Sequence, residues 1–286
     1  MKLLHSVPVA NSALSFFLPK GQYGKIIIEY DLDAAAGVTI TKAQLGNVKL
    51  AWNGEDVINI DAEALSGMNN LYGGVAKFAA AAGGATRCMI VIPCGMWWDR
   101  KHVYDVGAND DVNINLSFSA IAAAAVSDSG DVRVYGKLQT GQMDYLHRIV
   151  QRNVTFSGAG TLADTYPISN ISQVYLKDPA TLLVTQIQIQ KDDETIVDAE
   201  TDIVNEYSDF IHQVETTSTM VAIELAESGS IGEALGGQVS YKYTVSGATT
   251  VEQYFSFIDW VPDKTAESSL RAKNKMNLAA NRARGR

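Results

Sequence analysis

The chain has 286 residues, 47% of them hydrophobic, which is enough for one or two domains with buried cores and excludes a disordered protein. The formal net charge of −9 excludes a body that attracts nucleic acid by its overall charge. Two cysteines, Cys88 and Cys94, do not indicate a disulfide framework, and we expect Cys88 to be inert core. No apolar run is long enough to span a bilayer. Polar residues interrupt the apolar start of the chain, so we expect no signal peptide and a product that stays in the cytoplasm.

The charge is unevenly distributed along the chain. Residues 1–145 carry a net charge of −3, whereas residues 146–262 carry 16 acidic against 5 basic residues. Residues 263–286 reverse the sign, with 7 basic and 2 acidic residues. Only this tail is therefore basic, and we expect no sequence-specific nucleic-acid binding by the body.

The first half of the chain is typical of short strands separated by polar turns. Alternating or β-branched segments predict strands at 14–18, 25–32, 38–41, 48–52, 55–60, 87–92, 112–118 and 131–138. A helix is expected after residue 60, ending near Gly73-Gly74. A loop at 93–101 holds Trp97 and Trp98.

The second half restarts the same plan after a linker expected at 140–148. Strands are predicted at 153–156, 170–176, 185–190, 194–198, 218–225, 238–245 and 252–260, with one helix running to about Gln213. Both halves therefore keep a single helix within a succession of strands.

One stretch occurs twice and indicates a duplication. Residues 48–72 and the segment from Thr185 both read as strand, polar turn, strand and helix, with Asn53-Gly54 marking the first turn. Asp61 and Asp198 fall at the same offset, where each would cap the N-terminus of its helix. We therefore predict an all-β fold of two tandem jelly-roll sandwiches, 1–145 and 146–262, each with one helix, followed by a basic C-terminal arm, 263–286.

The sequence lacks the residues of a catalytic site. Its four histidines are scattered, and it contains no nucleophile elbow, phosphate loop or Cys-x-x-Cys motif. The acidic runs Asp110-Asp111 and 192–194 are compatible with structural calcium, but solvated turns explain them as well. We therefore expect no enzyme and no cofactor.

Two features favour interaction surfaces. Trp97 and Trp98 are adjacent aromatics that either anchor an interface or fold onto their own sandwich. The tail reads as a basic amphipathic helix suited to anionic lipid, nucleic acid or an acidic neighbouring surface, with a disordered solubilising tail as the alternative. Its basic residues are Arg271, Lys273, Lys275, Arg282, Arg284 and Arg286.

Three places carry a resemblance to a known family. They are 18–23 followed by the strand 26–30; 44–50 with Asn53-Gly54; and Asn153, Ala163-Asp164 and Pro167 with the run 171–189. Together they resemble the double jelly-roll major capsid proteins of tailless, membrane-containing icosahedral viruses, and among these the corticovirus type from marine bacteriophages. The basic segment after Asp263 has no counterpart in the resemblance.

The resemblance implies a homotrimer whose six similar lobes tile an icosahedral shell over an internal lipid membrane. Its expected partners are neighbouring capsomers, vertex (penton) and minor capsid proteins and the membrane. The expected location is the virion capsid, assembled in the host cytoplasm. Two other classes stay open. One is another virion or surface β-sandwich, such as a spike or carbohydrate-binding module. The other is an enzyme on a double β-sandwich, such as a glycoside hydrolase or cupin-like protein, which would need convergent histidines or carboxylates in one cavity.

Overall fold

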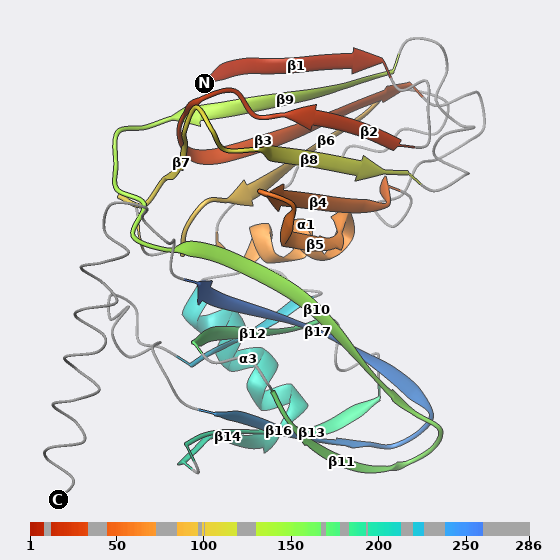
Figure 1. Cartoon of the computed structure of the whole chain (residues 1–286). Coiled ribbons are helices and arrows are strands. Elements are labelled where there is room, and N and C mark those ends of the chain that lie inside the picture. Colours follow the sequence, from red (N-terminus) through yellow and green to blue (C-terminus); the bar gives the residue numbers. More distant parts are fainter. Residues whose placement is uncertain are drawn as a thin grey trace, which may run out of the picture.

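The computed structural model describes residues 1–8, 13–33, 45–72, 85–96, 99, 101–118, 130–166, 170–177, 183–192, 194–212, 220–225 and 238–259. Within them the chain forms two β-sandwiches, one above the other in Figure 1, each with one helix at its side. Trp97, Trp98 and the whole segment 263–286, with its six predicted contact residues, lie outside the described residues.

In the ranges that the structure describes, the first sandwich contains nine strands and one helix. One sheet has the order β1-β9-β3-β6, with the short strand β7 paired to β3, and the facing strands follow the order β5-β4-β8-β2. The elements are β1 (Lys2–Pro8), β2 (Ala13–Phe17), β3 (Gly21–Asp33), β4 (Asn47–Trp52), β5 (Glu55–Asp61), α1 (Ala62–Leu71), β6 (Ala85–Pro93), β7 (Tyr104–Val106), β8 (Val112–Ser117) and β9 (Asp131–Leu138).

The described residues of the second sandwich form eight strands and one helix. Its strands follow the orders β15-β12-β17-β10 and β11-β16-β13-β14. The elements are β10 (Leu146–Phe156), β11 (Gly160–Thr165), β12 (Ile171–Lys177), β13 (Val184–Lys191), β14 (Glu194–Glu200), α3 (Thr201–His212), β15 (Met220–Glu224), β16 (Val239–Val245) and β17 (Thr249–Asp259).

The two halves have the same topology. If β7 is left out and the strands of each half are counted from one to eight, both halves contain the sheets 1-8-3-6 and 5-4-7-2. In both halves the helix follows the fifth strand. This is the order of a jelly roll, so the predicted all-β fold of two tandem jelly rolls is confirmed.

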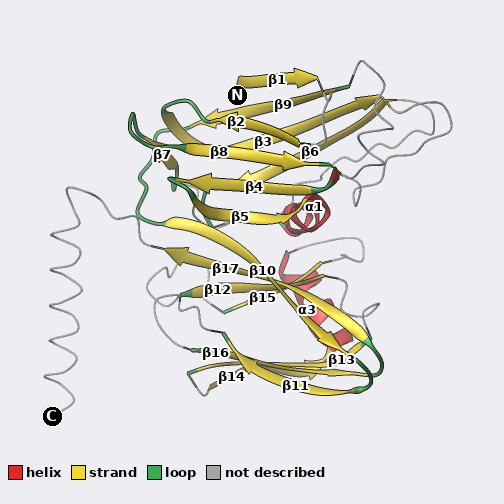
Figure 2. Ribbon diagram, turned by 45° about the vertical axis from the view of Figure 1, so that its right-hand side comes forward, coloured by secondary structure: helices red, strands yellow, loops and turns green. Residues whose placement is uncertain are grey.

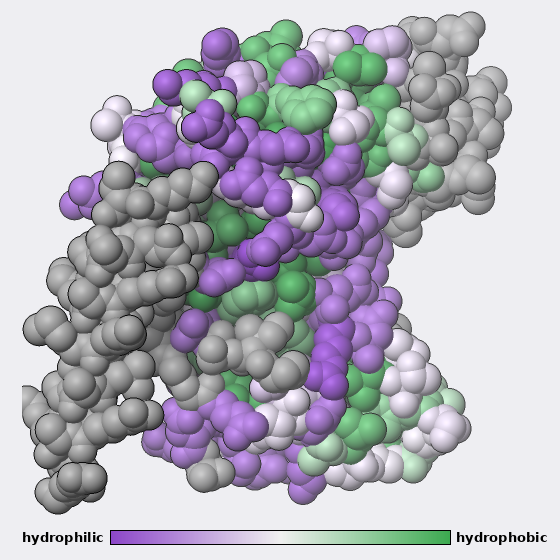
Figure 3. Space-filling view, viewed as in Figure 1, coloured by the Kyte–Doolittle hydropathy of each residue, from purple (hydrophilic) through white to green (hydrophobic). Residues whose placement is uncertain are grey.

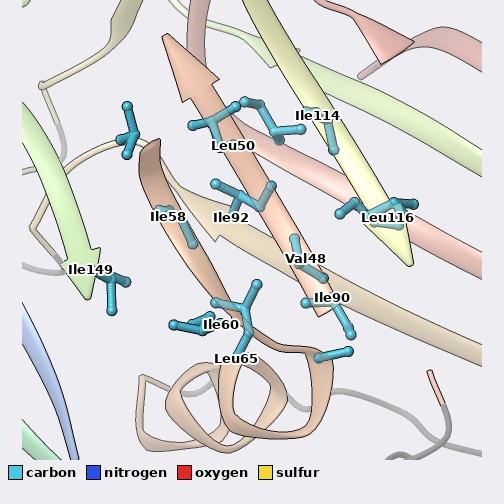
Figure 4. Packing of buried hydrophobic residues seen from close by; sticks show 14 of the residues in the cluster. Val48, Leu50, Ile58, Ile60, Leu65, Ile90, Ile92, Ile114, Leu116 and Ile149 are labelled. Carbon is cyan, nitrogen blue, oxygen red and sulfur yellow. The ribbon is translucent and has the colours of Figure 1, made fainter. Parts of the chain in front are cut away.

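A parallel strand pair joins the two jelly rolls. Ile149 and Val150 of β10 pair with Ile58 and Asn59 of β5, which makes one continuous sheet of eight strands. Figure 2 shows this sheet passing from the upper to the lower sandwich through β5 and β10. Ile149 is 2% exposed and belongs to the core of the first jelly roll, although its strand starts the second. Figure 4 shows it beside the core that surrounds Ile58, Ile60 and Leu65.

Alternation of apolar and polar residues builds each core. In β3 the side chains of Ile26, Ile28, Tyr30 and Leu32 are fully buried. Successive side chains of a strand point to opposite faces, so the residues between them form the outer face of the sheet. A second core, centred on β12, β13, β16 and β17, fills the lower sandwich.

The predicted repeat of hairpin and helix is present, but its second copy is two residues longer. Asp61 caps α1, since its Oδ1 accepts a hydrogen bond of 2.6 Å from the amide of Ala64. The expected cap at Asp198 is wrong: this residue lies in β14 and accepts hydrogen bonds from Gln186 and Gln188. The longer hairpin shifts the start of α3 to Thr201 and leaves Asp198 in the strand.

Three strands and one boundary differ from the sequence expectation. The sequence did not predict β1, β7 or β11: β7 has only three residues, β11 is mostly polar, and a register shift between Leu3 and His5 breaks the alternation of β1. The expected linker at 140–148 is shorter than predicted, because β10 already begins at Leu146. The expected strand at 38–41 lies outside the described residues.

Candidate functional site

The described histidines, cysteines and carboxylates do not gather into a reactive centre. No group of three or more of them within the described ranges is placed to hold a metal ion. His5 bonds to the carbonyl oxygen of Phe17 at 2.6 Å. In the other jelly roll, His212 lies 3.4 Å from Glu224. Both cysteines are free and buried, and burial raises the pKa of the Cys94 thiol well above its usual range. A buried neutral thiol is a poor nucleophile.

The acidic runs stabilise turns. Asp110 accepts hydrogen bonds from the Gly107 amide at 2.8 Å and from Asn53 at 3.3 Å. Asp192 accepts a bond of 2.9 Å from the amide of Gln238. Asp193 lies outside the described residues. These oxygens are therefore engaged by the chain itself in the described turns.

A shallow polar hollow of about 260 Å³ lies on the outer side of β11, β13 and β16. Asp164, on its wall, forms an ion pair of 2.5 Å with Arg152 and accepts a longer bond from Tyr241. Tyr241 is only 2% exposed, so its ring offers no platform for a sugar. The hollow holds no second carboxylate among its lining residues with which Asp164 could act as an acid–base pair.

A connected polar network lies at the junction between the jelly rolls. Tyr72, which caps the C-terminus of α1, bonds through its hydroxyl to the hydroxyl of Tyr175 in β12. Tyr175 donates to Gln173 at 2.6 Å, and Gln173 donates to both carboxylate oxygens of Glu224 at 2.8 and 2.7 Å. Gln173 and Tyr175 are 1% and 3% exposed. A connected network of this kind fixes one relative placement of the packed elements.

Two further contacts attach α1 to the second jelly roll. Glu63, in the first turn of α1, forms an ion pair of 3.0 Å with Lys177 of β12. Asp61 accepts a hydrogen bond of 2.8 Å from the hydroxyl of Tyr254 in β17. Lys177 is also 3.3 Å from Glu252. Asp61 thus has two functions, since one of its oxygens caps the helix and the other bonds across the junction.

Two buried histidines lie where loops of the first jelly roll meet the start of β10. The ring of His102 stacks on Tyr145, with 3.9 Å between centroids, and Tyr145 donates to Asp99 at 3.1 Å. His147 bonds to the hydroxyl of Ser256 at 2.8 Å. Burial lowers the pKa of both histidines from 6.5 to about 4, so both rings are neutral at pH 7.

Sequence reasoning missed this junction. The alternation of Gln173, Tyr175 and Lys177 is typical of a solvent-facing strand side, yet α1 covers it. The only signal in the sequence is that Tyr175 and Tyr254, both bulky aromatics, stand on faces that alternation assigns to solvent.

A stripe of exposed apolar side chains lies along α3. We call Ile203, Tyr207 and Phe210 the α3 stripe; they are 57%, 64% and 79% exposed and follow helical spacing on one face. In Figure 3 the outline narrows between the two jelly rolls, and apolar patches appear there between polar surroundings.

Of the helices in the described part of the chain, neither is long and apolar enough to cross a membrane.

No protein-family model and no curated protein matches the sequence. Solved structures do share the fold. The major capsid protein from bacteriophage PM2 is 15% identical, with a TM-score of 0.65 over 92% of this chain and 97% of that one. The major capsid protein of Sulfolobus turreted icosahedral virus is 11% identical, with a TM-score of 0.66 over 90% and 95%. The PBCV-1 virus capsid is 10% identical, with a TM-score of 0.61 over 89% and 92%. At these identities the likeness shows the fold, and the fold is the double jelly roll.

Proposed function

We propose that the chain is a major capsid protein, whose trimers form pseudo-hexameric tiles of an icosahedral shell over an internal membrane. The observation that carries the proposal is the repeated strand order, shared with viral major capsid proteins over at least nine tenths of this chain and of theirs. A structural role also agrees with the chemistry of the described residues, whose polar groups join parts of the fold.

The junction supports a rigid tile. A shell subunit must transmit lateral force without letting its two lobes turn against each other. The shared eight-stranded sheet and the hydroxyl and carboxylate network attach the lobes at two places. Two sandwiches side by side also provide broad lateral faces for neighbouring copies.

The proposal includes the partners and the location. The partners are two further copies of the chain, neighbouring capsomers, vertex and minor capsid proteins and the internal lipid membrane. The protein would assemble in the host cytoplasm and reside in the virion capsid. We propose no sequence-specific binding of nucleic acid, because the body of the protein is acidic.

The mass of the purified protein in solution tests the proposal. Light scattering or native mass spectrometry should find a stable species of three times 30.9 kDa, or a shell. The measurement is repeated with calcium and with a chelator, because an ion bound at the acidic turns would change association. A monomer at micromolar concentration under both conditions would overturn the capsid proposal.

For the tail we propose attachment to anionic lipid. Residues 263–286 carry a net charge of +5 on a body of −14, and each basic residue near an anionic bilayer contributes about 1 kcal/mol. A chain ending at Pro262 should still fold and associate, but should no longer sediment with anionic liposomes as the full chain does. If the full chain also ignores liposomes, the tail binds a neighbouring capsomer instead.

For Trp97 and Trp98 we propose a place in a contact between subunits.

A further inference from the structure

The internal repeat allows residues of the two helices to be matched by their contacts. Asn69 of α1 both donates to and accepts from the backbone of Val91, at the edge strand β6. Ser208 of α3 accepts from the amide of Ala222, in the edge strand β15. Both helix residues lie seven positions after the first residue of their helix. Asn69 therefore corresponds to Ser208, and Val91 corresponds to Ala222.

The outer side of α1 is covered by the second jelly roll of the same chain. Ala64, Met68 and Leu71 are 1%, 3% and 1% exposed. They belong to one cluster with four residues on the outer face of the second jelly roll, which are Tyr175, Met220, Ala222 and Tyr254. The contact between the jelly rolls therefore has an apolar centre, with the ion pair of Glu63 and the hydroxyl bond of Tyr72 at its ends.

The same positions of α3 form the α3 stripe. Counting from Asn69 and Ser208, Ala64, Met68 and Leu71 correspond to Ile203, Tyr207 and Phe210. The side chains on α3 are larger than those on α1, yet nothing in the described part of the chain covers them. Single exposed apolar residues are ordinary, but three aligned ones with two aromatics are typical of an interaction surface.

The register of the sheets identifies the surface that would cover the stripe. Tyr175 pairs with Ala222 on one side and with Tyr254 on the other. In the first jelly roll, Ile27 pairs in the same way with Val91 and Tyr135. The row Ile27, Val91 and Tyr135, on the outer face of β3, β6 and β9, is therefore the counterpart of the row that α1 covers. We call it the receiving row; its side chains are partly exposed.

Charged side chains accompany both surfaces. Helix α3 contains three carboxylates, Asp202, Glu206 and Asp209, and neither Lys nor Arg. The receiving row is flanked by basic side chains of the same face, which are Lys25, Arg87, Arg133 and Lys137. Arg87 and Arg133 are already paired with the carboxylates Glu29, Asp31 and Asp131 of the same face. Lys25 and Lys137 lie opposite each other at one end of the row, where they can approach the carboxylates of α3.

We propose that the α3 stripe of one copy docks on the receiving row of a second copy, and so repeats between copies the contact that α1 makes within the chain. The contact is head-to-tail, and such contacts generate a ring when the rotation closes. Three copies would close a ring of six jelly rolls joined by one kind of contact. The proposal rests on the capsid function and names the surfaces through which the subunits associate.

The sheet edges support the same arrangement. Within the chain β5 and β10 pair at the junction, and their counterparts by strand order are β14 and β1. Both β14 and β1 are the outermost strands of their sheets, and they expose apolar side chains such as Ile196 at 40% and Leu3 at 50%. Docking of the α3 stripe would place these two edges next to each other, as β5 and β10 are placed within the chain.

The double variant Tyr207→Ser/Phe210→Ser tests the proposal. Both side chains are mostly outside the core of the single chain, so the variant should keep the fold and the far-UV circular dichroism spectrum of the unchanged chain. Its association should weaken by roughly 100-fold or more, because buried aromatic anchors dominate interface energies. The matched control is Phe17→Ser, an aromatic that is 65% exposed on β2, at the far end of the eight-stranded sheet. The control should associate like the unchanged chain in analytical ultracentrifugation.

Cross-linking identifies the receiving surface. Ile211 corresponds to Tyr72, and Ile27 to Tyr175, so a short bismaleimide should join Ile211→Cys of one copy to Ile27→Cys of the next. The chain with both substitutions should give covalent trimers, and each single variant should give none. If the unchanged chain associates but the serine variant associates equally well, or no cross-link forms, this inference fails and the capsid function stands. If the unchanged chain is monomeric under all conditions, both fail.

Discussion

Acid should destabilise the folded chain through the buried residues His102 and His147. Burial lowers the pKa of both rings to about 4, and desolvation of the charged form is the main cause. Asp99 and Asp144 oppose this effect at His102, and the nearby His102 further lowers the pKa of His147. In the unfolded chain both rings take up protons near pH 6.5.

The sign and size follow from proton linkage. Between pH 6.5 and 4 the unfolded chain binds more protons than the folded chain, so the free energy of unfolding falls as the pH falls through this window. One pKa unit corresponds to about 1.36 kcal/mol. At pH 5 each histidine should therefore cost about 2 kcal/mol, and the pair about 4 kcal/mol, relative to pH 7.5.

Urea unfolding followed by circular dichroism, at fixed protein concentration, measures this cost at pH 7.5 and 5.0. The variant His102→Phe keeps the stack on Tyr145, and His147→Gln keeps a polar partner for Ser256. Each should remove about half of the pH-dependent loss, and the double variant should remove nearly all of it. The control His5→Gln changes a ring on the edge strand β1 and should leave the loss unchanged. An equal loss in the double variant and the unchanged chain would refute the reasoning.

Three further substitutions test the fold by urea unfolding. Asp61→Ala removes both the cap of α1 and the hydrogen bond to Tyr254. It should lower the free energy of unfolding by at least about 1–2 kcal/mol more than Asp198→Ala, because Asp198 caps no helix. Equal losses in the two variants would contradict this assignment. Gly46→Ala should be strongly destabilising, because Gly46 has φ +75° and a Cβ there would lie 1.9 Å from the carbonyl oxygen of Ser117. If this variant is as stable as the unchanged chain, the turn can relax and the reasoning is wrong. Ile149→Ala should cost about 2–5 kcal/mol, since it opens a cavity in the first core from a strand of the second jelly roll, whereas Gln151→Ala on the same strand should be nearly neutral.

Sequence patterns predicted the fold because its main signals are local. Alternation in 112–117 and 131–138, the turn at Asn53-Gly54 and the cap at Asp61 depend on neighbours a few residues away. The repeat of hairpin and helix was visible for the same reason, since each unit builds its own two strands and helix. The failure at Asp198 has an equally local cause, because two additional hairpin residues moved the helix start without changing the composition.

The sequence by itself determined the all-β class, the two repeats and the lack of catalytic motifs. Only the tertiary structure decided how the repeats meet, because that depends on residues far apart in the chain. Tyr254 bonds to Asp61, and the two are separated by 193 positions. The packing of α1 on β12 and β15 buries Tyr175, whereas the matching face of α3 stays exposed. The two helices have nearly the same local plan, so no periodicity distinguishes the face of α1 that is covered within the chain from the matching face of α3 that stays exposed.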